Sequence, residues 1–495
     1  MLDNIASALP QLFTLQNLLY VNLGLFLGII IGALPGLTAT MGVVLMLPLT
    51  FTMDSVPGIV LLLGVYFGGI YGGSITAILL NTPGTPASAA TAWDGNPLAR
   101  NGQAGKALDM ATIASFCGGI ISSFFLLFFA PTIAKFALKF GAPDMFSLCL
   151  FGLTIVVSLC SKDIVKGLTM AGFGLVLASI GLDPVGGMTR LTFGIRGLTG
   201  GIDLVTALIG LFAIGEILFK VLNIDEMGSK ISEKVSGYCS KKELAPCGKT
   251  ILRGSVIGTI VGAIPGTGSV IASFLSYDTA KKRSKHPEEF GNGSLEGVAA
   301  SESANNGVTG GALIPLLTLG IPGDTVTAVM LGALMMQNLT PGPMLFTTHG
   351  TLVYALILST FFVNIFMLIQ GKLLIKPFSN VTKIPMRLLV PILTVLCLTG
   401  TFALRNTMFD VRVMLVFGVI AFFAVKNGFP TTPMVLAFVL GPTAEKYLRK
   451  ALVLSKGSWA IFFTKPISLV FIILAVLSLY LSLKKNNSFQ KLRDD

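Results

Sequence analysis

The stretch Gly32-Ala-Leu-Pro-Gly36 lies inside the apolar segment 18–50, which is too long for one membrane span. A closely similar stretch, Gly262-Ala-Ile-Pro-Gly266, interrupts the apolar segment 251–277 at an offset of 230 residues. Proline removes a helical hydrogen bond and glycine loosens the backbone, so each stretch predicts a break in a helix. Such a break persists at membrane depth only where protein or a watery cavity covers the freed polar groups.

A second pair of motifs repeats in the same order. Gly72-Gly73 precede Pro83-Gly84, and Gly311 precedes Pro322-Gly323 at an offset of 239 residues. Two motifs that recur at nearly the same offset predict two structural repeats. We expect a first transmembrane repeat over residues 1–235, a second over 236–460, and a C-terminal helix with a basic cytoplasmic tail over 461–495.

The composition around these motifs excludes a water-soluble protein. Of the 495 residues, 53% are hydrophobic and only 12% are charged, whereas soluble chains carry about 25% charged residues. The mean hydropathy is +0.82. At about 20 residues per span, the apolar segments predict an all-α polytopic membrane protein with about 12 helical spans and broken or re-entrant segments.

The placement of charge predicts how the broken segments enter the membrane. Residues 1–93 carry only Asp3 and Asp54, and the net charge of +12 lies in basic clusters between apolar segments. The positive-inside rule assigns these clusters, among them Lys135 and Lys139, to cytoplasmic loops. Because basic clusters flank segment 251–277 on both sides, we expect a re-entrant hairpin there. Segment 18–50 has no basic flank, so we expect the two repeats to be inverted.

Polar side chains gather at the four predicted breaks. Unwound backbone offers carbonyls to a small cation, and new helix N-termini offer N–H groups and a positive dipole end to an anion. These groups together suit a carboxylate carried with Na⁺ or H⁺. The candidate substrate-binding residues are Pro35, Gly36, Thr38, Asn81, Thr82, Pro83, Gly84, Thr85, Pro265, Gly266, Thr267, Ser269, Asn305, Asn306, Pro322 and Gly323.

Acidic residues beside the second-half breaks are the candidates for ion coupling, since intramembrane carboxylates are costly and usually functional. These candidates are Glu302 and Asp324, together with the hydroxyl of Thr325. For each hydroxyl, helix packing is the competing explanation, because small residues pack membrane helices closely. For Asp94, a turn-forming role competes with a site.

Other chemistries have little support in the sequence. No Walker lysine follows Gly266-Thr-Gly268, and no Ser–His or paired-carboxylate arrangement is present, so we expect a protein that is not an enzyme. The cysteines and histidines lack metal-ligand spacing. No soluble segment is long enough to carry a nucleic-acid site. We therefore expect no catalytic residues, no metal site, and no cofactor other than a coupling Na⁺ or H⁺.

The motifs resemble those of the large membrane subunit (TctA type) of the tripartite tricarboxylate transporters, over about residues 20–345. The matching stretches are Gly32–Thr38, Gly72–Pro86, Asp94–Lys106, Glu302–Asn306 and Gly310–Gly323. The resemblance implies a multi-pass carrier in the bacterial inner membrane, driven by an ion gradient rather than ATP. It also implies two partners, a small four-helix membrane subunit and a periplasmic solute-binding protein that delivers a carboxylate.

We therefore expect an ion-gradient-driven importer of a di- or tricarboxylate. Two alternatives stay open: the same type of transporter acting on a different small solute, and a membrane scaffold subunit that does not transport. A scaffold would not need paired breaks with matching hydroxyls.

Overall fold

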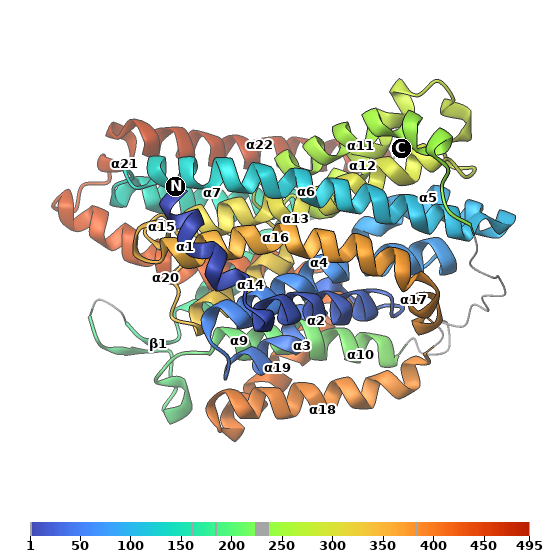
Figure 1. Cartoon of the computed structure of the whole chain (residues 1–495). Helices are drawn as coiled ribbons and strands as arrows, with labels where there is room; N and C mark the ends of the chain where they lie inside the picture. The colour runs from blue at the N-terminus through green and yellow to red at the C-terminus, as the bar shows by residue number, and fades with distance from the viewer. Residues whose placement is uncertain (1, 161–162, 184–185, 223–236, 383, 495) are drawn as a thin grey trace. The chain divides into compact units, whose positions relative to one another are not determined.

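The computed structural model describes residues 2–160, 163–183, 186–222, 237–382 and 384–494. Regular structure in these residues is almost entirely helical (Figure 1). The strands β1 (Gly181–Leu182) and β2 (Thr189–Arg190) pair as one short antiparallel ladder. The predicted all-α class is therefore confirmed.

Two compact units make up the chain, and each combines segments that are distant in sequence. Unit 1 contains Met1–Ala134 and Lys220–Gly400, and unit 2 contains Lys135–Phe219 and Thr401–Asp495. This division describes packing rather than repetition. The predicted repeat boundaries at residues 235 and 460 stay a prediction.

Unit 1 holds all four predicted breaks. Its helices are α1 (Leu2–Leu12), α2 (Leu15–Gly32), α3 (Ala39–Thr50), α4 (Ser55–Leu80), η1 (Pro86–Ser88), α5 (Ala89–Leu98), η2 (Ala99–Gln103), α6 (Ala104–Ala137, whose last turn belongs to unit 2), α11 (Lys241–Gly262), α12 (Gly268–Arg283), η6 (Pro287–Glu289), α13 (Leu295–Leu319), α14 (Thr325–Met336), α15 (Leu345–Thr348), α16 (Gly350–Leu373), α17 (Ile375–Val381) and α18 (Met386–Arg405, whose last turns belong to unit 2).

Unit 2 packs α7 and α8 against α20, and α7 also against α22. Ion pairs fasten the β1–β2 ladder, with Arg190 Nη1 at 2.7 Å from Glu445 Oε1 and Arg449 Nη1 at 3.1 Å from Asp183 Oδ2. The helices of this unit are α7 (Ala142–Cys160), α8 (Ile164–Ala178), η3 (Arg196–Leu198), α9 (Leu204–Leu208), η4 (Ile209–Ile214), α10 (Gly215–Val221, whose last two residues belong to unit 1), α19 (Met408–Lys426), α20 (Thr431–Leu454), α21 (Ile461–Thr464) and α22 (Pro466–Asp494).

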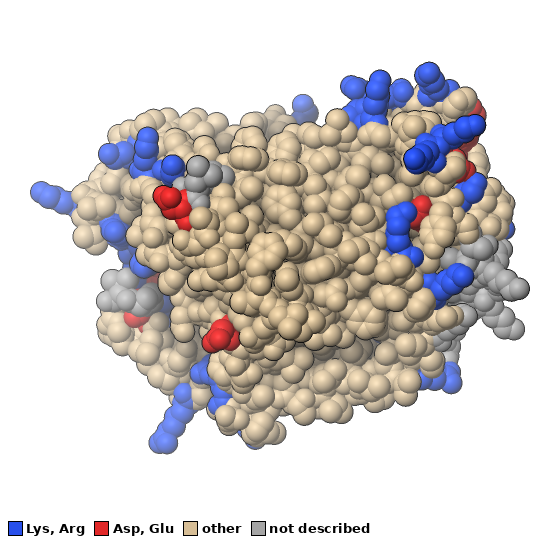
Figure 2. All heavy atoms as spheres, viewed as in Figure 1, with Lys and Arg blue, Asp and Glu red and all other residues tan. Residues whose placement is uncertain are grey.

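The membrane assignment follows from helix length and surface. Among the described residues, eight helical segments are long and apolar enough to cross a membrane, and four shorter apolar helices accompany them. Figure 2 shows the charged side chains at the margins of the visible face, with a broad uncharged band between them. The polytopic class is confirmed, and the number of about 12 spans stays a prediction.

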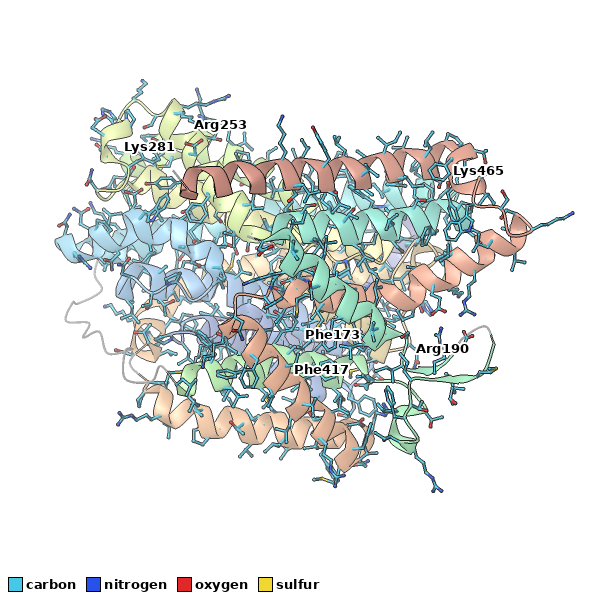
Figure 3. All side chains as sticks on the ribbon, turned by 180° about the vertical axis from the view of Figure 1, so that it is seen from behind. Phe173, Arg190, Arg253, Lys281, Phe417 and Lys465 are labelled. Carbon is cyan, nitrogen blue, oxygen red and sulfur yellow. The ribbon has the colours of Figure 1, made fainter. Side chains whose placement is uncertain are left out.

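Both long broken segments form helical hairpins. In each, the chain turns at a Pro-Gly pair whose glycine is left-handed, with φ of 79° at Gly36 and at Gly266. Glycine adopts this conformation without steric penalty. At the base of the α11–α12 hairpin, Glu296 accepts hydrogen bonds from Thr250 (2.6 Å) and Ser284 (2.7 Å). The hairpin therefore starts and ends at one end of unit 1, as predicted, and Figure 3 shows Arg253 and Lys281 together there.

The two hairpins insert from opposite ends of unit 1. Ser74 of α4 contacts Glu302 of α13, whereas Leu63 of α4 lines a small apolar space with Leu317 of α13, so these helices run antiparallel. The α2–α3 hairpin is based at the start of α4, near Ser55. The α11–α12 hairpin is based at the start of α13. Within unit 1, the inverted arrangement of the hairpins matches the sequence expectation.

Glycines let each hairpin pack closely against its neighbour. A Cβ on Gly28 of α2 would overlap the backbone of Val65 in α4, and a Cβ on Gly258 of α11 would overlap the backbone of Ala304 in α13. Small residues at a spacing of four commonly allow such backbone approach in membranes. The hairpins are therefore held by close backbone contact.

One part of the charge interpretation is wrong. Helix α6 has 34 residues and carries Lys106 near its start and Lys135 near its end. At 1.5 Å per residue such a helix is about 50 Å long, which exceeds the hydrocarbon thickness of about 30 Å. The basic residues at its two ends cannot share one side of the membrane. The positive-inside assignment is retained for unit 1 only, where the hairpin base of α11–α12 is basic.

Candidate functional site

The four breaks meet in the interior of unit 1. The Gly84 N–H donates to the carbonyl of Gly73 (3.3 Å), and the Gly266 N–H donates to the carbonyl of Gly323 (2.8 Å). The Pro-Gly segment after α4 therefore folds back onto α4, and the segment after α13 contacts the tip of the α11–α12 hairpin. The hydroxyl oxygens of Thr40 and Thr325 lie 3.1 Å apart. This last contact joins the first hairpin to the last break.

The two break segments after α4 and α13 have matching local structure. Helix α4 ends in left-handed Asn81 and α13 in left-handed Gly320. Four residues further on, Thr85 lies 2.7 Å from Ser88 and Asp324 accepts a 2.7 Å hydrogen bond from Thr327. These pairs are equivalent at the offset of 239. Only the second pair forms a side-chain cap, in which Asp324 caps α14.

The predicted residues divide by exposure. The partly or well exposed ones are Pro35, Gly36, Thr38, Asn81, Thr82, Pro83, Pro265, Thr267, Ser269 and Thr325. The buried ones are Gly84, Thr85, Gly266, Glu302, Asn305, Asn306, Pro322, Gly323 and Asp324. Three of the four breaks combine exposed and buried predicted residues, whereas Pro35, Gly36 and Thr38 at the first break are all partly exposed.

Several predicted hydroxyls already have structural roles. Thr38 caps α3 by accepting the Met41 N–H at 3.2 Å. Thr267 donates to the carbonyls of Val261 and, at 2.9 Å, Ile264, which closes the tip of the hairpin. The packing explanation accounts for these two side chains.

Asp324 caps α14 and is fully engaged. Its Oδ1 accepts the Thr327 N–H (2.7 Å) and the Thr327 hydroxyl (2.7 Å), and its Oδ2 accepts the Tyr66 hydroxyl (2.9 Å). An ionised carboxylate at a helix N-terminus is stabilised by the helix dipole and by the free N–H groups there. This geometry gives Asp324 a capping role.

Glu302 has a different setting, in the middle of α13 and completely buried. Its Oε1 contacts Thr91 of α5 at 2.5 Å. Its Oε2 contacts Ser74 of α4 at 2.8 Å, Ser115 of α6 at 3.1 Å and the Asn306 amide at 3.4 Å. Neutral groups from four helices therefore converge on one carboxyl.

Two asparagines next to Glu302 retain unused hydrogen-bonding capacity. Among the described residues, neither polar atom of the Asn305 carboxamide has a hydrogen-bond partner, and the same holds for Asn306 Oδ1. Both residues are completely buried. Because leaving such groups unpaired costs about 1–3 kcal/mol, they indicate a position prepared for a polar ligand.

Asp94 has a structural role. It is buried on α5, and its Oδ1 accepts the N–H groups of Gly291 (2.7 Å), Gly293 (3.0 Å) and Ser294 (2.9 Å). The Tyr277 hydroxyl donates to its Oδ2 at 2.8 Å. Asp94 thus fastens the loop before α13.

The partners of the two carboxylates were missed from sequence. The sequence around the three hydroxyl partners of Glu302 is apolar or loop-like, and a hydroxyl there is expected to serve helix packing. These partners are Ser74, Thr91 and Ser115. Tyr66 lies in an apolar helix without a motif. The signal that would find them is their position on helix faces that turn toward α13, and this depends on tertiary packing.

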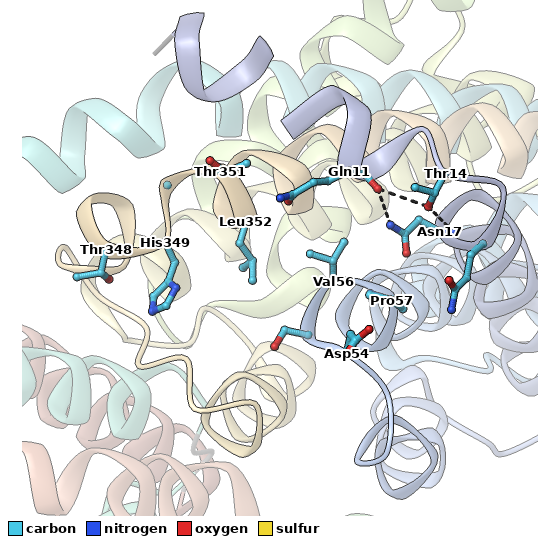
Figure 4. Close-up of a pocket in the computed structure, with 13 residues that line it drawn as sticks. Gln11, Thr14, Asn17, Asp54, Val56, Pro57, Thr348, His349, Thr351 and Leu352 are labelled. Atoms are coloured by element: carbon cyan, nitrogen blue, oxygen red, sulfur yellow. Dashed lines mark hydrogen bonds between the residues drawn. The ribbon is translucent and has the colours of Figure 1, made fainter. Parts of the chain in front are cut away.

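A polar pocket of about 590 Å³ lies at the end of unit 1 opposite the basic hairpin base (Figure 4). Asp54 is its one acidic side chain, and His349 is its one imidazole. The remaining polar groups are amides and hydroxyls, and Asn17 Nδ2 donates to the Gln11 carbonyl at 2.6 Å. Its lining contains no Lys or Arg and comes from Gln11, Thr14, Gln16, Asn17, Asp54, Ser55, Val56, Pro57, Thr348, His349, Gly350, Thr351 and Leu352.

Comparison with known proteins gives a consistent result. The family profile described as "Tripartite tricarboxylate transporter TctA family" matches residues 18–436. An Agrobacterium vitis protein described as "Uncharacterized 52.8 kDa protein in TAR-I ttuC' 3'region" is 38% identical over 468 residues, covering 94% of this chain and 93% of the relative. A second protein of that organism, from the TAR-II ttuC' 3'region, is 40% identical over 227 residues, covering 44% of this chain and 94% of the relative. No solved structure matches this chain.

Proposed function

Because the chain belongs to the tripartite tricarboxylate transporter TctA family, we propose that it is the large membrane subunit of an ion-gradient-driven carboxylate importer. In this proposal a periplasmic solute-binding protein delivers a di- or tricarboxylate, and a small four-helix membrane subunit completes the complex in the bacterial inner membrane. The family consists of transporter components rather than enzymes. The candidates for coupling Na⁺ or H⁺ are Glu302, Asp324 and Thr325.

The observation that carries this proposal is the meeting of two oppositely inserted hairpins at the Thr40–Thr325 level. One hairpin is based at the end of unit 1 with the polar pocket and the other at its basic end. Secondary transporters place their substrate between inverted repeats at broken helices near the midplane. If one hairpin moved so that its tip separated from the tip of the other, this level would open to one side of the membrane at a time.

An anion is favoured by the N-terminus of α12, at the tip of the second hairpin. Helix α12 starts after Thr267 without a side-chain cap, and its first residues are partly exposed. Ala272 of α12 packs in one cluster with Ala304 of α13, and Ala304 is adjacent to unpartnered Asn305. Uncapped N–H groups and a carboxamide are both good carboxylate donors. We assign the substrate carboxylates to this neighbourhood.

Asp324 does not oppose this assignment. Its charge is balanced locally by the N-terminus of α14 and by three hydrogen bonds from Tyr66 and Thr327. It therefore cancels the positive end of α14 and leaves the N-terminus of α12 as the stronger anion site.

The polar pocket is the proposed route from the periplasm. It lies at the end of unit 1 where the lining carries no basic residue, which is the outer end under the positive-inside rule. Its amides and hydroxyls offer neutral hydrogen bonds that let a carboxylate pass without trapping it.

The test starts with the solute. A thermal-shift screen of di- and tricarboxylates against the cognate binding protein identifies the ligand, and radiolabelled uptake into proteoliposomes follows. We expect uptake that needs the binding protein and an imposed Na⁺ or H⁺ gradient and no ATP. Binding of a solute without carboxylate groups would favour the alternative substrate class. Absence of uptake under both gradients would favour a scaffold and overturn the proposal.

A further inference from the structure

The two buried carboxylates of unit 1 are held in different ways. Asp324 lies at a helix N-terminus, where N–H groups and the dipole stabilise its charge. Glu302 lies far from either end of α13, and its contacts are hydroxyls and one amide. No nitrogen of a described Lys, Arg or His residue forms an ion pair with it. A permanently charged Glu302 would therefore be an isolated buried anion, which costs several kcal/mol.

Two of the hydroxyls around Glu302 have a second hydrogen-bond acceptor within reach of their single proton. Ser74 has one hydroxyl proton but lies 2.7 Å from the Tyr71 carbonyl and 2.8 Å from Glu302 Oε2. Both are acceptors, so an ionised Glu302 would compete with the Tyr71 carbonyl for the single Ser74 proton. A protonated carboxyl removes this competition, because Glu302 can donate to Ser74 while Ser74 donates to the Tyr71 carbonyl.

At the other carboxyl oxygen of Glu302, two acceptors again compete for one hydroxyl proton. Thr91 has one hydroxyl proton and contacts both Glu302 Oε1 (2.5 Å) and Ser301 Oγ (3.0 Å). Ser301 uses its own proton toward the Gly297 carbonyl at 3.0 Å. If Glu302 donates to Thr91, then Thr91 can donate to Ser301, and this series of hydrogen bonds ends at the Gly297 carbonyl. One added proton therefore satisfies either side of the carboxyl.

Other titratable groups on the surrounding helices do not supply a counter-charge. The Tyr71 hydroxyl of α4 forms a 2.7 Å hydrogen bond with the Thr112 hydroxyl. Asp109 of α6 is paired with Lys372 at 2.7 Å. Asp94 of α5 and Glu296 of α13 are engaged by the loop and hairpin contacts described above, and Cys117 of α6 is neutral as a thiol.

We propose that Glu302 is the site of the coupling proton, so that the importer is a proton symporter. This inference rests on the proposed function and selects one ion and one carboxyl within it. A proton taken from the periplasm converts the carboxylate to a neutral carboxyl that hydrogen-bonds to Ser74 or Thr91. Its release to cytoplasmic water restores the carboxylate.

The geometry favours a proton over Na⁺. A bound metal ion needs oxygen lone pairs directed at it, whereas an Asn306 N–H group points at Ser115 Oγ at 2.7 Å. The oxygen–oxygen contacts of 2.5–3.1 Å at Glu302 are hydrogen-bond distances, which a shared proton fits.

Infrared spectroscopy tests the site without transport. The full chain in nanodiscs, at neutral pH in KCl, should show a protonated carboxyl band that shifts in D₂O and disappears in Glu302→Gln. Absence of that band from the wild-type minus Glu302→Gln difference would overturn the proposal. Loss of the band when NaCl replaces KCl would overturn it as well, because the site would then bind Na⁺.

Transport tests the coupling role, with Glu296→Gln as the matched control on the same helix. In proteoliposomes with the four-helix subunit, the binding protein and the carboxylate it binds, wild type and Glu296→Gln should accumulate solute under an acid-outside gradient. Glu302→Gln should only exchange solute and should ignore the gradient. An unchanged gradient response in Glu302→Gln would overturn the proposal. Wild-type protein that retains the infrared band but moves no solute would instead refute the proposed function.

Discussion

Thr40 at the start of α3 and Thr325 at the start of α14 are 285 residues apart in sequence, yet their hydroxyl oxygens lie 3.1 Å apart. In the break before α14, Gly323 accepts a hydrogen bond from Gly266 at the tip of the α11–α12 hairpin. The Thr40–Thr325 contact therefore connects the tips of both hairpins. It defines the level in unit 1 where the proposed substrate site lies.

The Thr40–Thr325 contact predicts an energetic coupling. Thr40→Val and Thr325→Val each remove one partner at nearly constant volume. A double-mutant cycle on the unfolding free energy should give a coupling of about 0.6–1 kcal/mol, as for other hydrogen bonds in membranes. Additive effects of the two substitutions would show that the hydroxyls do not interact.

Close packing of the second hairpin predicts a strong effect of side-chain volume. Gly258→Val should overlap the backbone of Ala304 and destabilise the protein by about 1–3 kcal/mol beyond the change in helix propensity. Gly248→Val is the matched control, because it lies on the same helix and faces open space. Equal losses of thermal stability in the two variants would contradict the described α11–α13 packing.

The unpaired amide of Asn305 predicts a separation of stability from activity. Asn305→Leu should leave the unfolding temperature unchanged or raise it, because no protein hydrogen bond is lost. Asn306→Leu should lower it, because the Asn306 amide donates to Ser115 at 2.7 Å. A destabilising Asn305→Leu would indicate that its carboxamide serves the fold rather than a ligand.

The hairpin base predicts a topology. In a cysteine-free background, single cysteines at Ser240 and Ser284 should react with an impermeant thiol reagent from the same side of the membrane, because Glu296 binds both ends of the hairpin. A cysteine at Thr348, in the polar pocket, should react from the other side. Labelling of the first two positions from opposite sides would exclude the hairpin.

The ion pair at the start of α11 predicts a pH dependence outside the membrane. A 2.5 Å hydrogen bond from Lys106 lowers the pKa of Glu243 from 4.5 to about 2. A lowered pKa adds stability above the unfolded value, and this contribution is lost as pH falls from 4.5 toward 2. The difference in unfolding temperature between wild type and Glu243→Gln should shrink over that range. The effect is small because the pair is solvent-accessible.

The sequence was sufficient for the hairpins because proline and glycine act locally. Pro265-Gly266 and its basic flanks fix a turn and its side without tertiary information, and the equivalent Pro35-Gly36 follows by repetition. The setting of Glu302 could not be derived this way. Its partners Ser74 and Ser115 come from other helices, and only packing brings them to the carboxyl.

The same distinction applies to the division of unit 1 from unit 2. Repeated motifs describe how the chain is built in sequence, whereas α16 and α6 join unit 1 through side-chain packing that no motif encodes. The capping role of Asp324 also depends on where α14 begins, which is set by Thr327 rather than by the break alone.

The most direct test of the account is gradient-driven uptake by wild type and Asn305→Leu in proteoliposomes with the loaded binding protein and the four-helix subunit. The account predicts that wild type accumulates the carboxylate and that Asn305→Leu, although as stable, accumulates far less. Undiminished accumulation by Asn305→Leu would contradict the claim that the carboxylate binds where the two hairpins meet.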